Sequence, residues 1–167
     1  TFWAFVPILL KTYSELYTHV HFNIPLLSFC IISIGSIACV LGSYGAKLYG
    51  TKKTAFYCLL LSGICCLLAP FFFMVENETI FILFLLFWGM VVIADSPLFS
   101  TLVAENAPER DKGTALTIVN CIGFSITILS IQLISTLFHS TSSNFVFLLL
   151  AIGPILGLFS MRFKRLF

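Results

Sequence analysis

Long runs of apolar residues, separated by short polar breaks, make up most of this chain. Five of the runs are long enough to cross a bilayer as a helix, which takes about 20 residues. They cover 24–46, 54–75, 79–104, 114–138 and 145–161. An apolar stretch at 1–17 precedes them and has the pattern of the second part of a further helix. Because nothing alternates at period two, the pattern predicts helices and not the strands of a membrane barrel.

Composition places these helices in a membrane. The chain is 59% hydrophobic and only 10% charged, whereas a soluble domain carries roughly 25% charged residues. Too few polar side chains are present to cover a globule in water, so the lipid bilayer is the expected partner. No basic stripe points to nucleic acid. We therefore predict an all-α integral membrane protein, with residues 1–167 forming one domain of six transmembrane helices, the first of them truncated.

Basic residues predict the orientation of the helices. The second and fourth polar breaks and the C-terminal tail hold eight of the nine Lys and Arg residues, and the ninth, Lys11, lies in the first stretch. The eight are Lys47, Lys52, Lys53, Arg110, Lys112, Arg162, Lys164 and Arg165. Because cytoplasmic loops carry the excess of Lys and Arg, these breaks and the C-terminus are predicted to be cytoplasmic.

Asp95 is the only carboxylate inside any of the long apolar runs. An ionisable group near the bilayer centre costs about 3 kcal/mol on insertion scales, and such groups tend to handle an ion, a proton or a substrate. Pro97 follows two residues later and should open the hydrogen-bond ladder beside the carboxylate. Asn120 lies at a similar depth in the next run and is a candidate partner. The alternative is a structural clamp, in which Asp95 bonds to Asn120 or to backbone without any transport role.

Two further polar residues are candidates for the same pathway. Lys11 is spaced i,i+4 from Glu15 and falls on the same helix face. It can either form an ion pair at the outer interface or face a cavity and attract an anion. Gln132 can either line a pathway or bond to a neighbouring helix. The runs 54–75 and 145–161 contain no strongly polar residue, so they are predicted to be outer, lipid-facing supports.

Small residues and prolines indicate how the helices pack. Ala38, Gly42 and Ala46 recur every four residues and form a ridge that permits close helix approach. Pro70 and Pro97 each free a backbone carbonyl, which in lipid needs a partner from a neighbouring helix. Both prolines are therefore predicted to mark packing sites or hinges.

The sequence offers little for catalysis or metal binding. All six cysteines lie within apolar runs and none forms a CxxC pair, so they are predicted to be buried packing residues. No cofactor and no metal site is expected, and no motif of an enzyme is present. The buried carboxylate favours a transporter. Two other functions stay open, namely an integral membrane enzyme such as a lipid-group transferase, and a structural or channel-forming subunit.

Two segments resemble a known family. The glycine-rich basic stretch Gly42-Ser43-Tyr44-Gly45-Ala46-Lys47-Leu48-Tyr49-Gly50-Thr51-Lys52-Lys53 is similar to a cytoplasmic loop that recurs in the major facilitator superfamily, although its usual acidic residue is missing and Lys47 stands near that place. The stretch 108–115 resembles the loop before the eleventh helix of that family. Residues 94–97 and 120–124 look like its bacterial members.

The resemblance implies a fold and a function. The chain would be the C-terminal six-helix half of a twelve-helix secondary transporter, and its other partners would be the missing N-terminal half and a small-molecule or ion substrate. Transport would proceed by alternating access, coupled to protons or ions, in a bacterial inner membrane. The implied pathway residues are Asp95, Asn120, Lys11 and Gln132, and the implied cytoplasmic gating loop contains Gly42, Gly45, Lys47, Gly50, Lys52 and Lys53.

Overall fold

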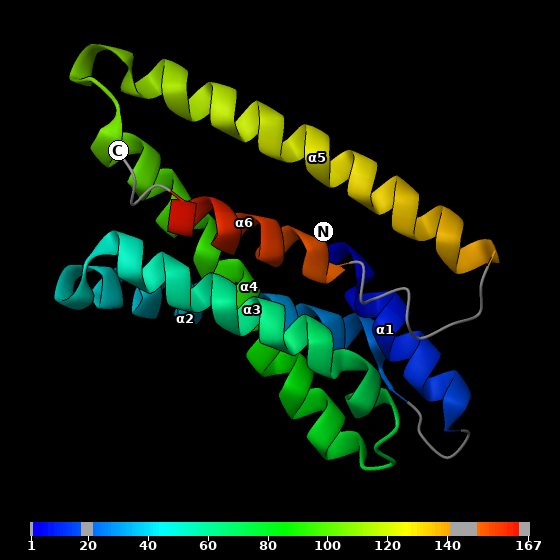
Figure 1. The fold of residues 1–167 in the computed structure, drawn as a ribbon. Coiled ribbons are helices and arrows are strands. Elements are labelled where there is room, and N and C mark those ends of the chain that lie inside the picture. Colours follow the sequence, from blue (N-terminus) through cyan, green and yellow to red (C-terminus); the bar gives the residue numbers. More distant parts are fainter. Residues whose placement is uncertain (1, 18–21, 141–149, 164–167) are drawn as a thin grey trace.

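A computed structural model describes residues 2–17, 22–140 and 150–163, and this part of the chain is helical without any strand (Figure 1). The helices in chain order are α1 Phe2–Leu16, α2 Ile24–Tyr49, α3 Thr51–Phe73, α4 Glu78–Asn106, the short 3₁₀ helix η1 Glu109–Asp111, α5 Lys112–Ser140 and α6 Ile152–Phe163. Four helical segments are long and apolar enough to cross a membrane, and these are Ile24–Tyr49, Thr51–Phe73, Glu78–Asn106 and Glu109–Thr136. The predicted all-α membrane bundle is therefore confirmed.

The break predicted at 47–53 is much shorter in the structure. Helix α2 continues to Tyr49 and α3 begins at Thr51, so Gly50 alone joins them. Gly50 adopts φ 89°, a conformation that side chains with a Cβ rarely take. Good helix formers such as the lysines at this corner do not terminate a helix, and the chain turns only where glycine permits it. The start of the last predicted run, 145–149, lies outside the described residues.

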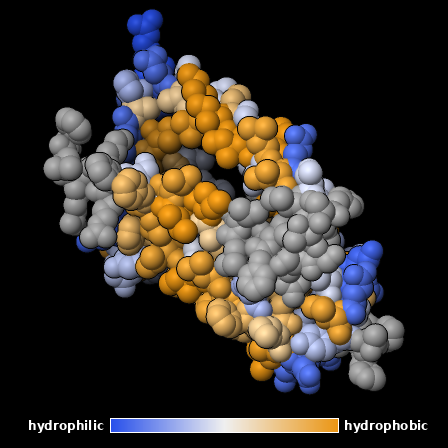
Figure 2. Space-filling model, turned by 45° about the vertical axis from the view of Figure 1, so that its right-hand side comes forward, coloured by the Kyte–Doolittle hydropathy of each residue, from blue (hydrophilic) through white to orange (hydrophobic). Residues whose placement is uncertain are grey.

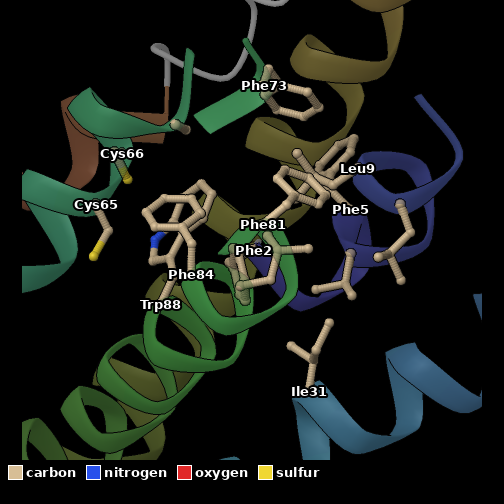
Figure 3. Close-up of a cluster of buried hydrophobic side chains, with 14 of the residues drawn as sticks. Phe2, Phe5, Leu9, Ile31, Cys65, Cys66, Phe73, Phe81, Phe84 and Trp88 are labelled. Atoms are coloured by element: carbon tan, nitrogen blue, oxygen red, sulfur yellow. The ribbon is translucent and has the colours of Figure 1, made fainter. Parts of the chain in front are cut away.

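Helix α1 packs into the bundle through an apolar face. Phe2, Phe5, Leu9 and Tyr13 recur at three- and four-residue spacing and are all buried. The Tyr13 ring stacks on Phe81 of α4 with centroids 4.0 Å apart. Figure 3 shows the side chains of Phe2, Phe5 and Leu9 directed toward the aromatic residues of α4.

Hydroxyl groups fix the far end of α1 to the turn between α3 and α4. The Tyr13 hydroxyl donates to the Val75 carbonyl at 2.7 Å, and the Tyr17 hydroxyl donates to the Phe73 carbonyl at 3.3 Å. Both bonds satisfy backbone acceptors at a helix end, where carbonyls lack intrahelical partners. Helix α1 is thus held by packing along its length and by hydrogen bonds at its C-terminal end.

Helices α2 and α4 meet along a seam of small residues. A Cβ on Gly35 would overlap the Ile93 side chain, and one on Gly42 would lie 3.6 Å from the Ala94 Cβ. From the opposite side, a Cβ on Gly89 of α4 would lie 3.1 Å from the Ile31 carbonyl oxygen. The ridge predicted through Gly42 therefore faces α4, and it extends to Gly35, about one turn N-terminal to Ala38.

Helices α3 and α6 make a second close contact. A Cβ on Gly157 would lie 2.7 Å from Leu59 Cδ2, and one on Gly63 would lie 3.3 Å from Pro154 Cβ. Helix α5 is different. Among its side chains as far as residue 136, only that of Ile134 is buried, and Figure 1 shows α5 running beside the other helices at a distance.

Candidate functional site

A cavity of about 980 Å³ lies between α5 and the rest of the bundle, and all six α-helices contribute to its lining. Figure 2 shows a hollow on this face of the molecule, bordered mainly by hydrophobic residues. A concave, mostly apolar space with a few polar groups is the usual form of a small-molecule site. The cavity is therefore the candidate functional site.

Helix α4 supplies the polar end of the cavity. Trp88, Val92 and Asp95 are spaced i, i+4 and i+7, so they share one helix face, and all three line the cavity. Asp95 is half-buried, and its carboxylate accepts a hydrogen bond from the Ser96 hydroxyl at 3.2 Å. Among the described lining residues Asp95 is the only charged one.

Pro97 shapes the backbone beside Asp95. It has no N–H to offer the Ile93 carbonyl one turn earlier, so that acceptor is freed within the apolar layer. The Cys39 thiol of α2 donates to this carbonyl at an S···O distance of 3.7 Å. The predicted need for a neighbouring donor is therefore met, and the donor is a cysteine that the sequence marked only as a packing residue.

Aromatic residues form the opposite end of the cavity. The rings of Phe2 and Trp88 are tilted against each other with centroids 4.5 Å apart, and Phe84 lies behind Trp88 at 5.5 Å. In Figure 3 the indole nitrogen of Trp88 is on the side of the ring toward Cys65 and Cys66. This buried N–H makes no regular hydrogen bond within the described structure, and the neighbouring Cys66 thiol is only a weak acceptor.

The structure does not bring Asn120 and Gln132 to Asp95. Both side chains are exposed, and neither lines the cavity. At about 100° per residue, each points roughly 120° away from the middle of the α5 face that lines the cavity through Ile126, Leu129, Ser130, Leu133 and Ile134. The prediction for Asn120 was based on depth in the membrane, and depth does not fix which way a helix is rotated. The carboxylate bonds to its own neighbour, and no hydrogen bond joins it to Asn120 in the described structure.

Lys11 is also outside the cavity. Its ammonium group lies 3.7 Å from the Glu15 carboxylate, and both side chains are largely exposed. Of the two alternatives for Lys11, the structure contains the ion pair.

The helices α3 and α6 were predicted to be lipid-facing supports, and both expose large apolar side chains, but the structure also places part of each at the cavity. Leu59, Ser62 and Cys66 of α3 line the cavity, as do Pro154 and Leu156 of α6. The sequence argument used polarity as the sign of a lining helix, but this cavity is mostly apolar. Trp88 was missed for the same reason, although its spacing from Asp95 places it on the same face.

The predicted cytoplasmic elements gather at one end of the bundle. The corner at Gly50 and the link from α4 to α5 both lie at the left of Figure 1, while the turn between α3 and α4 lies at the lower right. At the first end the Thr51 hydroxyl bonds to the Glu105 carboxylate at 2.8 Å. Lys47, Lys52 and Lys53 are exposed there, as expected for a solvated basic corner.

These features define a class, a helical integral membrane protein whose cavity has a single carboxylate among its described lining residues. The sequence profile of the Major Facilitator Superfamily matches residues 1–131. The chain therefore belongs to this superfamily of membrane transporters. Neither a curated protein nor a solved structure matches the chain.

Proposed function

We propose that the chain forms one half of a secondary active transporter that moves a small solute by alternating access. The other half is an N-terminal bundle of six helices, and the cavity at Asp95 faces the pathway between the two halves. The solute crosses as one bundle rocks against the other around a site near the midplane of the bilayer. The proposed location is a bacterial plasma membrane. The observation that supports this most directly is the carboxylate of Asp95 on the wall of the cavity, the only charged group among its described lining residues.

Asp95 is the proposed coupling group. The side chain of an aspartate in an apolar cavity is stable when it is protonated or paired with a cation. Its charged form without a partner is costly in free energy. Among the described residues, the other ionisable groups at the cavity are the thiols of Cys39 and Cys66, and the Cys58 thiol also interacts with Asp95. No basic side chain among the described lining residues neutralises Asp95. Loading and unloading of Asp95 therefore sets which side of the bilayer the cavity opens to.

Pro97 and the α2–α4 seam give this proposal its mechanical part. The seam holds α4 firmly against α2, whereas the missing backbone bond at Pro97 lets the segment around Asp95 adjust. Proline-interrupted helices near a binding site are a recurring feature of transporters. We propose that a change of occupancy at Asp95 is absorbed at Pro97, two residues from the carboxylate.

The test uses the full-length protein in proteoliposomes with an imposed pH gradient, screened against labelled cationic, anionic and neutral solutes. At least one solute should accumulate. For that solute, Asp95→Asn should abolish gradient-driven accumulation and preserve exchange of labelled for unlabelled solute. Asp111→Asn, in the exposed η1 segment, is the matched control and should behave as the unmodified protein. Unchanged accumulation in Asp95→Asn removes this residue from coupling, and failure of every solute to accumulate refutes transport itself.

A further inference from the structure

The lining of the cavity restricts the chemistry of what it can hold. Its only described charge is negative, and no Lys, Arg or His is among the lining residues that the structure describes. Polar neutral groups are few, with hydroxyls at Ser62, Ser96 and Ser130. An anion would be repelled by Asp95, and a sugar or an amino acid would leave most of its polar groups unpaired against apolar walls.

The two ends of the cavity differ in character. Asp95 and Trp88 are seven residues apart on one helix face, which separates them by about 10 Å along the axis. Phe2 and Trp3 of α1 join Trp88 at the aromatic end. A ligand that satisfies both ends carries a positive charge at one end and an apolar or aromatic body at the other. The faces of aromatic rings also attract cations, so the aromatic end does not oppose a delocalised charge.

We infer that the cavity binds a monovalent lipophilic organic cation, with its charge at Asp95 and its body against Phe2, Trp3 and Trp88. This inference rests on the proposed transport function and adds the substrate class to it. One carboxylate neutralises one positive charge, so a dication would remain half-compensated in an apolar site. Because Asp95 carries one negative charge, binding of one cation replaces one proton on its carboxylate.

The test measures binding of tetraphenylphosphonium to the purified full-length protein in detergent, with empty micelles as blank. Tetraphenylborate, which has nearly the same shape and the opposite charge, is the matched probe. The phosphonium should bind saturably and the borate should not. Asp95→Asn should weaken phosphonium binding at least about tenfold, because it removes one partner of a desolvated charge pair. Asp95→Glu should retain binding.

A second pair of variants protects the test against a misfolded Asp95→Asn protein. Ser130→Trp places a large side chain into the cavity from α5 and keeps the carboxylate, whereas Gln132→Trp places it outside the lining. Only the first should lose phosphonium binding. Equal binding of phosphonium and borate, or phosphonium binding unaffected by both Asp95→Asn and Ser130→Trp, overturns the inference. If the proteoliposome screen instead finds an anion or a neutral solute, the transporter proposal stands and the assignment of a cation is wrong.

Discussion

The α2–α4 seam and helix α5 form two walls of the same cavity and are built in opposite ways. Along the seam, Gly35, Gly42 and Gly89 bring two backbones together until a single methyl group at Gly35 would collide with its neighbour. On α5, a Cβ added to Gly113 or Gly123 would meet nothing within 4 Å. Glycine therefore permits close helix packing in the seam, whereas the glycines of α5 have no neighbouring helix close to them. We conclude that the cavity has a fixed wall carrying Asp95 and a second wall whose position is set by few internal contacts.

This difference bears on how an alternating-access protein can move. Packed interfaces have discrete arrangements and do not deform gradually. A seam as close as that between α2 and α4 is therefore expected to travel as one body, and the adjustment proposed at Asp95 and Pro97 is local to that segment of α4. Helix α5, which contacts the rest mainly through α4 and η1, can change its distance from the cavity without separating a packed pair.

The largest test of this comparison introduces a leucine into each wall. Gly35→Leu should overpack the seam and cost about 3 kcal/mol or more, because Ile93 cannot withdraw from a side chain that would overlap it. Gly123→Leu on α5 should change stability little, because the added side chain meets open space. The measurement is the thermal midpoint of the full-length protein in detergent, followed by size-exclusion chromatography. Similar losses in the two variants would show that α5 is packed as closely as the seam.

A second test concerns α1, which packs against both helices of the seam. Tyr13→Phe keeps the ring stacked on Phe81 and removes only the bond to the Val75 carbonyl. We expect a loss of about 1 kcal/mol, the usual contribution of one hydrogen bond. Tyr17→Phe, which removes the longer bond to Phe73, is the matched control and should cost less. If Tyr13→Phe is neutral, the hydrogen bond does not contribute, and α1 is held by packing, as the seam is.

The membrane-spanning helices were predictable from the sequence because hydropathy over about 20 residues is a strong signal. The closeness of α2 and α4 was partly predictable, since Gly42 belongs to a visible small-residue ridge. Gly35 was not recognised, because nothing local distinguishes a glycine that meets Ile93 from one such as Gly123 that meets nothing. That distinction depends on which helix lies opposite, and the sequence does not state it.

The candidate site was predictable for one residue and not for its surroundings. Asp95 stands out because a buried charge is costly whatever surrounds it. Asn120 and Gln132 were chosen by depth and polarity, and the rotation of α5 about its axis turned both away. Rotation is weakly encoded in α5, whose apolar residues occur on every face, so hydrophobicity does not specify an inward side. The mostly apolar lining also meant that Ser62 and Trp88 gave no polar signal to find.

The smallest expected effect concerns the hydrogen bond from Cys39 of α2 to the carbonyl of α4 that Pro97 leaves free. Cys39→Ala removes the thiol that bonds to the Ile93 carbonyl, and hydrogen bonds between membrane helices average about 0.6 kcal/mol. Pro97→Ala restores a backbone N–H for the same carbonyl and should make the thiol redundant. Cys39→Ala should therefore lower the thermal midpoint of the unmodified protein, but should lower that of the Pro97→Ala variant hardly at all. The measurement compares these two shifts. Cys39→Ser, which keeps a donor, is the control for the change in size. Equal effects of Cys39→Ala with and without Pro97 would mean that Cys39 contributes packing only, and that the carbonyl freed beside Asp95 is available to whatever occupies the cavity.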